Sequence, residues 1–124
     1  LAPDIMLPAA GQGALAVQCR ADDAALIAQL AVLDDVGTRA CVTAERSFLA
    51  GLDGSCRTPI AALALPDPEN AQTALLHGRL LAEDGTELVE NTCRFDPADL
   101  DAAGAAGEQL AAELRARAPH LVTA

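Results

Sequence analysis

Residues 73–95, TALLHGRLLAEDGTELVENTCRF, decide the fold of this 124-residue chain. Two stretches within it, 73–82 and 87–95, have the composition and alternation that are typical of strands. The Asp-Gly pair between them is a hairpin signal. A third strand is predicted over 59–65, PIAALAL, because the turn-forming residues PDPEN follow it. These stretches together predict a three-stranded antiparallel sheet.

A helix is predicted on the N-terminal side of this sheet, from about residue 36 to residue 52, with Asp35 as its N-cap. Apolar residues recur in it at steps of three and four, which indicates one buried face. That face consists of Cys41, Ala44, Phe48 and Leu52. Arg39 and Arg46 are seven residues apart, so they share a different face of the same helix.

A second helix is predicted after the sheet, from about residue 97 to residue 118. Asp96 is its expected N-cap and Pro97 its first helical residue. Arg115 and Arg117 fall near its C-terminus, where the helix dipole favours cations. The face expected to be buried consists of Leu100, Ala103, Gly107, Leu110 and Leu114. The order of elements predicts a small α+β domain with both helices packed on one face of the sheet.

Residues 1–35 do not fit into this predicted sheet. Alternation over 14–19 predicts a strand, and the following residues predict a helix capped by Asp22 or Asp23. A lone strand and a lone helix bury little of each other's surface. We therefore interpret this region as the tail of a unit whose other elements are missing, with an orphan strand and helix, and the residues from about 36 onward as a separate α+β domain.

The composition argues against several classes of function. The net charge is -10 and every basic residue is an arginine, so the chain is a poor match for nucleic acid, which needs basic patches. We expect no membrane span, because no apolar run is long enough. The four cysteines form no CxxC pair, so a metal site is not predicted. We expect free thiols and a cytoplasmic location.

One cysteine has an unusual position within LDGSCRTPIA, residues 52–61. Cys56 follows a glycine-containing stretch in a predicted turn between a helix and a strand, and loops often carry function. Arg57 beside it favours the thiolate. The other cysteines fall in periodic segments and are expected in the core: Cys19, Cys41 and Cys93. Cys56 is therefore the candidate nucleophile, and an inert loop thiol is the alternative that the residues alone leave open.

Two stretches, LPAAGQGALAVQCR (7–20) and VTAERSFLAGLDGSCRTPIA (42–61), together resemble the porphobilinogen deaminases, also called hydroxymethylbilane synthases. These are transferases of tetrapyrrole and heme biosynthesis. The resemblance is specific over the first 61 residues and weaker in the rest of the chain. One departure is visible, since the family often has two glycines before the cysteine and this chain has Gly54 and Ser55.

The resemblance implies a function and a set of site residues. Family members condense four porphobilinogen molecules into hydroxymethylbilane and release ammonia. They use a dipyrromethane cofactor held by a thioether, which by motif match is on Cys56. Arg46, Gln12 and Gly13 match further cofactor-binding residues. The catalytic aspartate of the family has no match here, so no catalytic residue is predicted in this chain.

The resemblance also implies an organisation and partners. Residues 1–35 match the end of the two cleft-forming α/β domains, and 36–124 match the cofactor-attachment domain. The implied partners are porphobilinogen and the growing oligopyrrole. We expect the full-length protein to be a monomer and this chain alone to be inactive. We also expect residues 1–33 of this chain either to mediate self-association or to be disordered.

The residues alone leave other interpretations open. Arg46 is also consistent with a solvated helix arginine paired with Glu45 or Glu90. The Gly-Gln-Gly sequence is also consistent with a plain turn, and His77 with a structural or surface role. The alternative function is a non-catalytic α+β interaction or regulatory module, with residues 1–33 as a docking arm.

Overall fold

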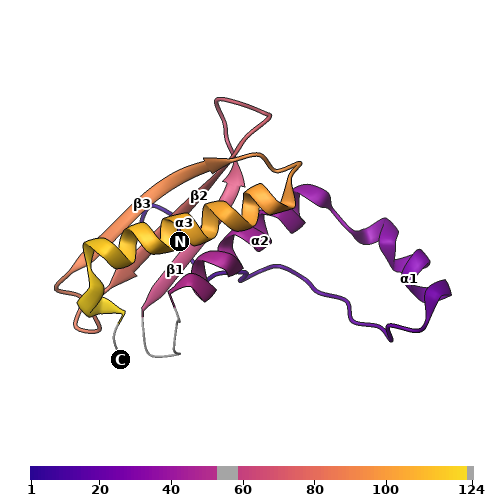
Figure 1. The fold of residues 1–124 in the computed structure, drawn as a ribbon, viewed down its shortest axis with the longest axis horizontal. Coiled ribbons are helices and arrows are strands. Elements are labelled where there is room, and N and C mark those ends of the chain that lie inside the picture. The colour runs from indigo at the N-terminus through magenta and orange to yellow at the C-terminus, as the bar shows by residue number, and fades with distance from the viewer. Residues whose placement is uncertain (53–58, 123–124) are drawn as a thin grey trace.

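A computed structural model of the chain describes residues 1–52 and 59–122, and its strands form one antiparallel sheet in the order β1-β2-β3. The two long helices pack against that sheet and against each other (Figure 1). This arrangement confirms the predicted α+β fold. The elements are α1 (Ala24–Leu30), a 3-10 turn (Ala31–Leu33), α2 (Val36–Gly51), β1 (Ile60–Pro66), β2 (Ala74–Leu81), β3 (Leu88–Phe95), α3 (Leu100–Arg117) and a 3-10 turn (Pro119–Leu121).

The hairpin of β2 and β3 is closed at the Asp-Gly pair, as the sequence predicts. Ala82 N donates to the carbonyl oxygen of Glu87 over 2.9 Å, and Leu81 is paired with Leu88 at the end of the ladder. From this register His77 lies opposite Thr92, so side chains at these positions share one face of the sheet.

The core lies between the helices and one face of the sheet. Alternate residues of β2 are buried there, at Ala74, Leu76, Gly78 and Leu80. The ring of Phe48 on α2 packs directly over Gly78, where a Cβ atom would come within 2.6 Å of the ring. A side chain at residue 78 would therefore displace Phe48, one of the two phenylalanines of the core.

Helix α2 follows its prediction closely. Asp35 caps it by accepting a hydrogen bond from Thr38 N over 2.7 Å. Ala44, Phe48 and Leu52 are buried as expected. Cys41 is half-buried and packs against the core from its edge.

The start of α3 differs from its prediction. The N-cap is Asp99, whose carboxylate accepts from Asp101 N and Ala102 N, and not Asp96. The carboxylate of Asp96 instead accepts from Ala98 N in the turn before the helix. Leu100 is consequently the first residue of the helix, and at 37% exposure it is not part of the buried face. The predicted burial of Ala103, Gly107, Leu110 and Leu114 is confirmed, and Arg115 and Arg117 occupy the last turn.

The N-terminal segment contains the main error of the sequence analysis. Helix α1 begins after Asp23, as predicted, but residues 14–19 form no strand. A strand needs a partner for its backbone groups, and no described segment pairs with this one. The segment and α1 project away from the sheet in Figure 1. Cys19, expected in the core, is half-buried outside the core cluster.

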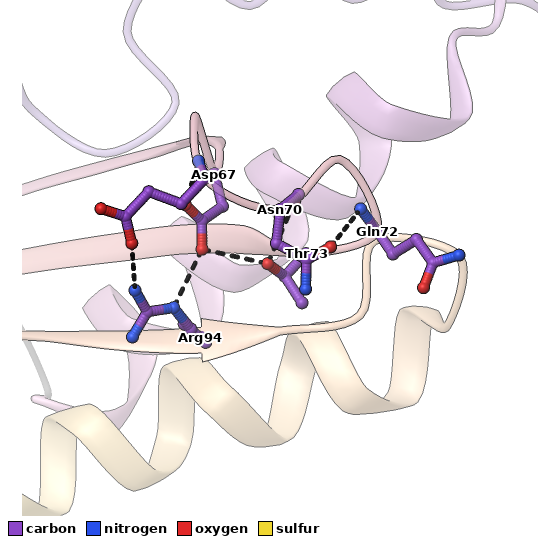
Figure 2. A network of polar contacts seen from close by, with 6 residues as sticks. Asp67, Asn70, Gln72, Thr73 and Arg94 are labelled. Carbon is purple, nitrogen blue, oxygen red and sulfur yellow. Dashed lines mark hydrogen bonds and ion pairs between the residues drawn. The ribbon is translucent and has the colours of Figure 1, made fainter.

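The connection from β1 to β2 is held by a buried carboxylate. Asp67 accepts hydrogen bonds from Arg94 Nε over 2.9 Å and from the Thr73 hydroxyl over 3.1 Å, as Figure 2 shows. It also accepts from Glu69 N over 2.9 Å. Asn70 turns the chain further by accepting from Gln72 N. These contacts fix the loop beside the end of β3.

Candidate functional site

A tight glycine turn follows the first residues that contact the sheet. Pro8 O accepts a hydrogen bond from Ala62 N of β1 over 3.0 Å, so the chain is anchored to the outer edge of the sheet here. Gly11 and Gly13 then adopt φ values of 69° and 97°. These values lie in the left-handed region, which favours glycine. Gln12 is thereby presented at an exposed turn.

Glu45 of α2 connects this turn to the sheet. Its Oε2 accepts from Gly11 N over 2.6 Å, and its Oε1 accepts from Ala64 N of β1 over 2.7 Å. The residue is only 6% exposed. Buried carboxylates need such partners, because desolvation of an unpaired charge is costly. Glu45 therefore joins three segments that are distant in sequence.

Arg46 lies beside the same turn. A Cβ atom placed on Gly11 would be 3.7 Å from Arg46 Nε. Among the described residues, Arg46 makes no hydrogen bond or ion pair, and its side chain is exposed. The pairing with Glu45 or Glu90 that the sequence left open is therefore absent from the described part of the chain. Its guanidinium group can bind a carboxylate in two-point fashion.

Glu90 has other partners, on the open face of the sheet. Its carboxylate contacts Arg79 and His77, with distances of 2.8 Å and 2.9 Å to the Oε2 atom. The Arg79 side chain in particular holds the pKa of Glu90 below its usual range, with His77 as the next contribution. The predicted structural or surface role of His77 agrees with this geometry.

A cavity of about 480 Å³ opens beside the glycine turn. Gln12, Gly13 and Glu45 are part of its wall, together with Cys41 of α2 and Thr73 of the β1–β2 loop. The cavity is therefore bounded both by the N-terminal segment and by the α+β domain. Its polar side chains include the Gln12 amide, the hydroxyls of Thr38 and Thr73, the Cys41 thiol and the carboxylates of Asp35 and Glu45, next to an apolar surface from the end of β1.

The thiols of Cys41 and Cys93 are poor nucleophiles in this structure. Burial raises the pKa of the Cys41 thiol, and the charges of Glu45 and Asp35 raise it further. Burial also raises the pKa of the Cys93 thiol, and the charge of Glu113 makes a smaller contribution in the same direction. A raised pKa keeps both in the neutral form, and the thiolate is the reactive species.

The predicted nucleophile, Cys56, and its neighbour Arg57 lie outside the described residues. In the sequence they fall between the end of α2 at Gly51 and the start of β1 at Ile60. Of the four predicted site residues, the structure thus brings Gln12, Gly13 and Arg46 to one turn and leaves Cys56 undescribed.

The remaining acidic residues of the N-terminal segment have ordinary structural roles. Asp22 pairs with Arg20, and Asp34 pairs with Arg39. Within residues 1–52 and 59–122, no three metal-ligating side chains gather at one point. No helix in the same ranges has the length and apolar character that crossing a membrane requires.

Glu45 is the site residue that the sequence analysis missed. A glutamate in a helix is ordinarily exposed, and its amide partners are 34 and 19 residues away. One signal was available, since Glu45 is on the predicted helix one residue after the buried Ala44. That signal indicates partial burial without identifying the partners.

Residues 39–116 match the family model for the porphobilinogen deaminase C-terminal domain. Residues 1–28 match the model for the porphobilinogen deaminase dipyromethane cofactor binding domain.

Individual relatives agree with these matches. Porphobilinogen deaminase 1 of Streptomyces coelicolor is 50% identical over 120 residues, which are 94% of this chain and 38% of that protein. Porphobilinogen deaminase of Paracoccus denitrificans is 49% identical over 118 residues, covering 94% of this chain and 36% of that protein. The chloroplastic porphobilinogen deaminase of Oryza sativa is 41% identical, covering 95% of this chain and 32% of that protein. The chain thus spans about a third of the length of these relatives.

Proposed function

Because the chain belongs to the porphobilinogen deaminase family, we propose that it is the C-terminal part of an enzyme that condenses four porphobilinogen molecules into hydroxymethylbilane. Each condensation releases ammonia. The observation that carries this proposal is the pair of family matches, which together cover most of the chain in the expected order.

The role proposed for Cys56 is to hold the dipyrromethane cofactor through a thioether. Its thiolate attacks the methylene carbon from which ammonia departs, so a carbon–sulfur bond replaces a carbon–nitrogen bond. A thiolate is well suited to this attack. Arg57 next to it in the sequence favours the charged form. Two of the other thiols, on Cys41 and Cys93, have raised pKa values that disfavour the same reaction.

The roles proposed for Arg46, Gln12 and Gly13 are to receive the attached cofactor. Dipyrromethane has acetate and propionate side chains, and the guanidinium of Arg46, which is unpaired among residues 1–52 and 59–122, is suited to a carboxylate. The open glycine turn leaves room for a pyrrole ring, and Gln12 supplies an amide. These features fit the group. When bound, dipyrromethane supplies the pyrrole carbon to which the first substrate unit is joined.

We further propose that residues 1–35 belong to the cleft-forming α/β domains and 36–124 to the attachment domain. The support is that the two family models match on either side of this boundary. The acid–base carboxylate would then lie outside this chain, and the chain alone would be inactive. A monomeric full-length enzyme in the cytoplasm is the corresponding proposal, and the free thiols of Cys19, Cys41 and Cys93 are consistent with that compartment.

The proposal is tested by the intact mass of the full-length protein that the gene encodes. We expect the wild-type protein to carry an adduct of two pyrrole units after exposure to porphobilinogen. The Cys56→Ser variant should fold but remain unmodified and inactive, because a hydroxyl is a much weaker nucleophile.

The matched controls are Cys41→Ala and Cys93→Ala. Each should lose about 1 kcal/mol of stability through a small cavity and still carry the adduct. An adduct on the Cys56→Ser protein, or its loss from a folded control, would contradict the assignment.

A further inference from the structure

Glu45 is a buried carboxylate that connects two separate backbone segments. Both of its oxygens accept hydrogen bonds from backbone amides, one in the glycine turn and one in β1. On the edge strand β1, Ala62 N donates to Pro8 O, and Ala64 N donates to Glu45 Oε1. The outer edge of β1 is therefore paired partly with the N-terminal segment and partly with this side chain.

The same carboxylate sets the distance between Arg46 and the glycine turn. Glu45 is fixed within α2, and its Oε2 holds Gly11 N at 2.6 Å. Arg46 follows it in the helix and has its Nε beside Gly11. The turn and the guanidinium group are consequently positioned by one helical segment. Hydrogen bonds to a charged acceptor are shorter and stronger than neutral ones, so this connection is stiff.

We infer that Glu45 is a positioning residue for the bound cofactor, holding Gln12 and Gly13 in place relative to Arg46. This inference rests on the proposed function, since those three residues are the proposed cofactor contacts. In this role Glu45 acts on the cofactor contacts indirectly, through its hydrogen bonds from Gly11 N and Ala64 N. It acts through the turn.

The inference predicts a specific kinetic pattern. The cofactor is tethered covalently, so a displaced turn misplaces a group that cannot dissociate. Misplacement of a tethered reactant lowers the rate of the chemical step and leaves substrate affinity largely intact. Loss of the Glu45 contacts should therefore reduce kcat and have little effect on KM.

The test uses Glu45→Gln in the full-length protein, with Glu108→Gln as its matched control. The amide side chain has nearly the same shape but only one acceptor oxygen, so its NH₂ group faces one of the two backbone N–H groups. Glu108 is an exposed residue of α3, and its substitution makes the same change of charge. We expect Glu45→Gln to carry the adduct on Cys56 but to lose at least about tenfold in kcat, with KM nearly unchanged. The control should behave as wild type.

Hydrogen exchange supplies a second measurement. In Glu45→Gln the amide of Gly11 or Ala64 should exchange at least about tenfold faster, while core amides of β2 keep their protection. Should Glu45→Gln fail to fold, Gly11→Ala replaces it. That change strains the turn at its positive φ and leaves α2 intact, so it should lower kcat in the same way.

The outcomes separate the two proposals. A wild-type protein without an adduct would overturn the proposed function and, with it, the positioning role. A wild-type protein with the adduct, together with unchanged kcat in folded Glu45→Gln or Gly11→Ala, would overturn the positioning role alone. A lower melting temperature with unchanged kcat per folded molecule would show that Glu45 is structural only.

Discussion

Asp67 shows how one side chain makes the stability of this fold depend on pH. Its side chain is 1% exposed and is surrounded by donors from Arg94, Glu69 and Thr73. The hydrogen bond from Arg94 is the largest cause of a lowered pKa, and the Glu69 amide is the next. The folded protein therefore binds a proton at this carboxylate less readily than the unfolded chain does.

A lowered folded-state pKa gives a definite sign. The stabilisation from Asp67 is fully present above the ordinary pKa of the carboxyl group and is lost as the pH falls through the lower pKa of the folded state. We expect Asp67→Asn to unfold at lower urea concentration near neutral pH, and its free energy of unfolding to decline less steeply with acid than that of wild type. Asp4→Asn, at the exposed N-terminal end, is the control. If the free energy of unfolding depended on pH in the same way for wild type and Asp67→Asn, the proposed role of Asp67 in acid sensitivity would be wrong.

The residues that form long-range polar contacts were also those that the sequence revealed least. Asp67 and Arg94 are 27 positions apart, and the amide partners of Glu45 are similarly remote. Periodicity detects which residues share a face of one element, but it does not identify a partner on another element. Gln12, Gly13 and Arg46 were found only through the family resemblance, and their proximity became visible only in the fold.

At the scale of elements, α2 and α3 are in close backbone contact at Gly107. A Cβ atom there would collide with the Ala44 carbonyl oxygen and lie 2.7 Å from Phe48 N. One turn earlier, a Cβ on Gly104 would meet only Ser47 Oγ, at an ordinary 3.6 Å. The two glycines thus occupy the same helix but different environments.

Alanine substitutions at these two positions should have opposite effects. Gly107→Ala should destabilise the protein by about 1–3 kcal/mol, because the backbones of the two helices must separate. Gly104→Ala should stabilise it by up to about 1 kcal/mol, through the better helix propensity of alanine. Urea unfolding of both variants beside wild type measures the difference. If both substitutions changed the free energy of unfolding equally and in the same direction, the contact between α2 and α3 at Gly107 would not be as close as described.

The elements themselves were predictable where the signal was local. Caps at Asp23 and Asp35 and the Asp-Gly hairpin depend on neighbouring residues, and all three are observed. The strand expected over 14–19 depends on a partner outside its own sequence, and no described segment supplies one. The start of α3 was misplaced because Asp96 and Asp99 are both acceptable caps, and only the fold selects between them.

At the scale of the whole molecule, the N-terminal segment is the part that packs least. Its apolar side chains are largely exposed, with Leu15 at 99%, Val17 at 65% and Val32 at 83%. Its backbone over 14–19 belongs to no ladder among the described residues. Unpaired backbone and exposed apolar side chains together favour association with another chain. A second copy of the same segment is always present in a solution of the purified chain.

We therefore expect the purified 124-residue chain to self-associate through residues 14–33. The association should weaken on dilution and should be lost in Leu15→Asp, because two copies would bring charged groups into a contact that otherwise buries leucine. Leu100→Asp makes the same chemical change at an exposed residue in the first turn of α3, where an acidic side chain is tolerated, and it should associate as wild type does. Sedimentation velocity over a range of concentrations distinguishes these cases. The prediction would be wrong if the wild-type chain stayed monomeric throughout and the amides of 14–33 were protected from exchange. The backbone groups of the segment would then be paired within one molecule. If Leu15→Asp and Leu100→Asp weakened self-association equally, the contact between copies would not be specific to residues 14–33.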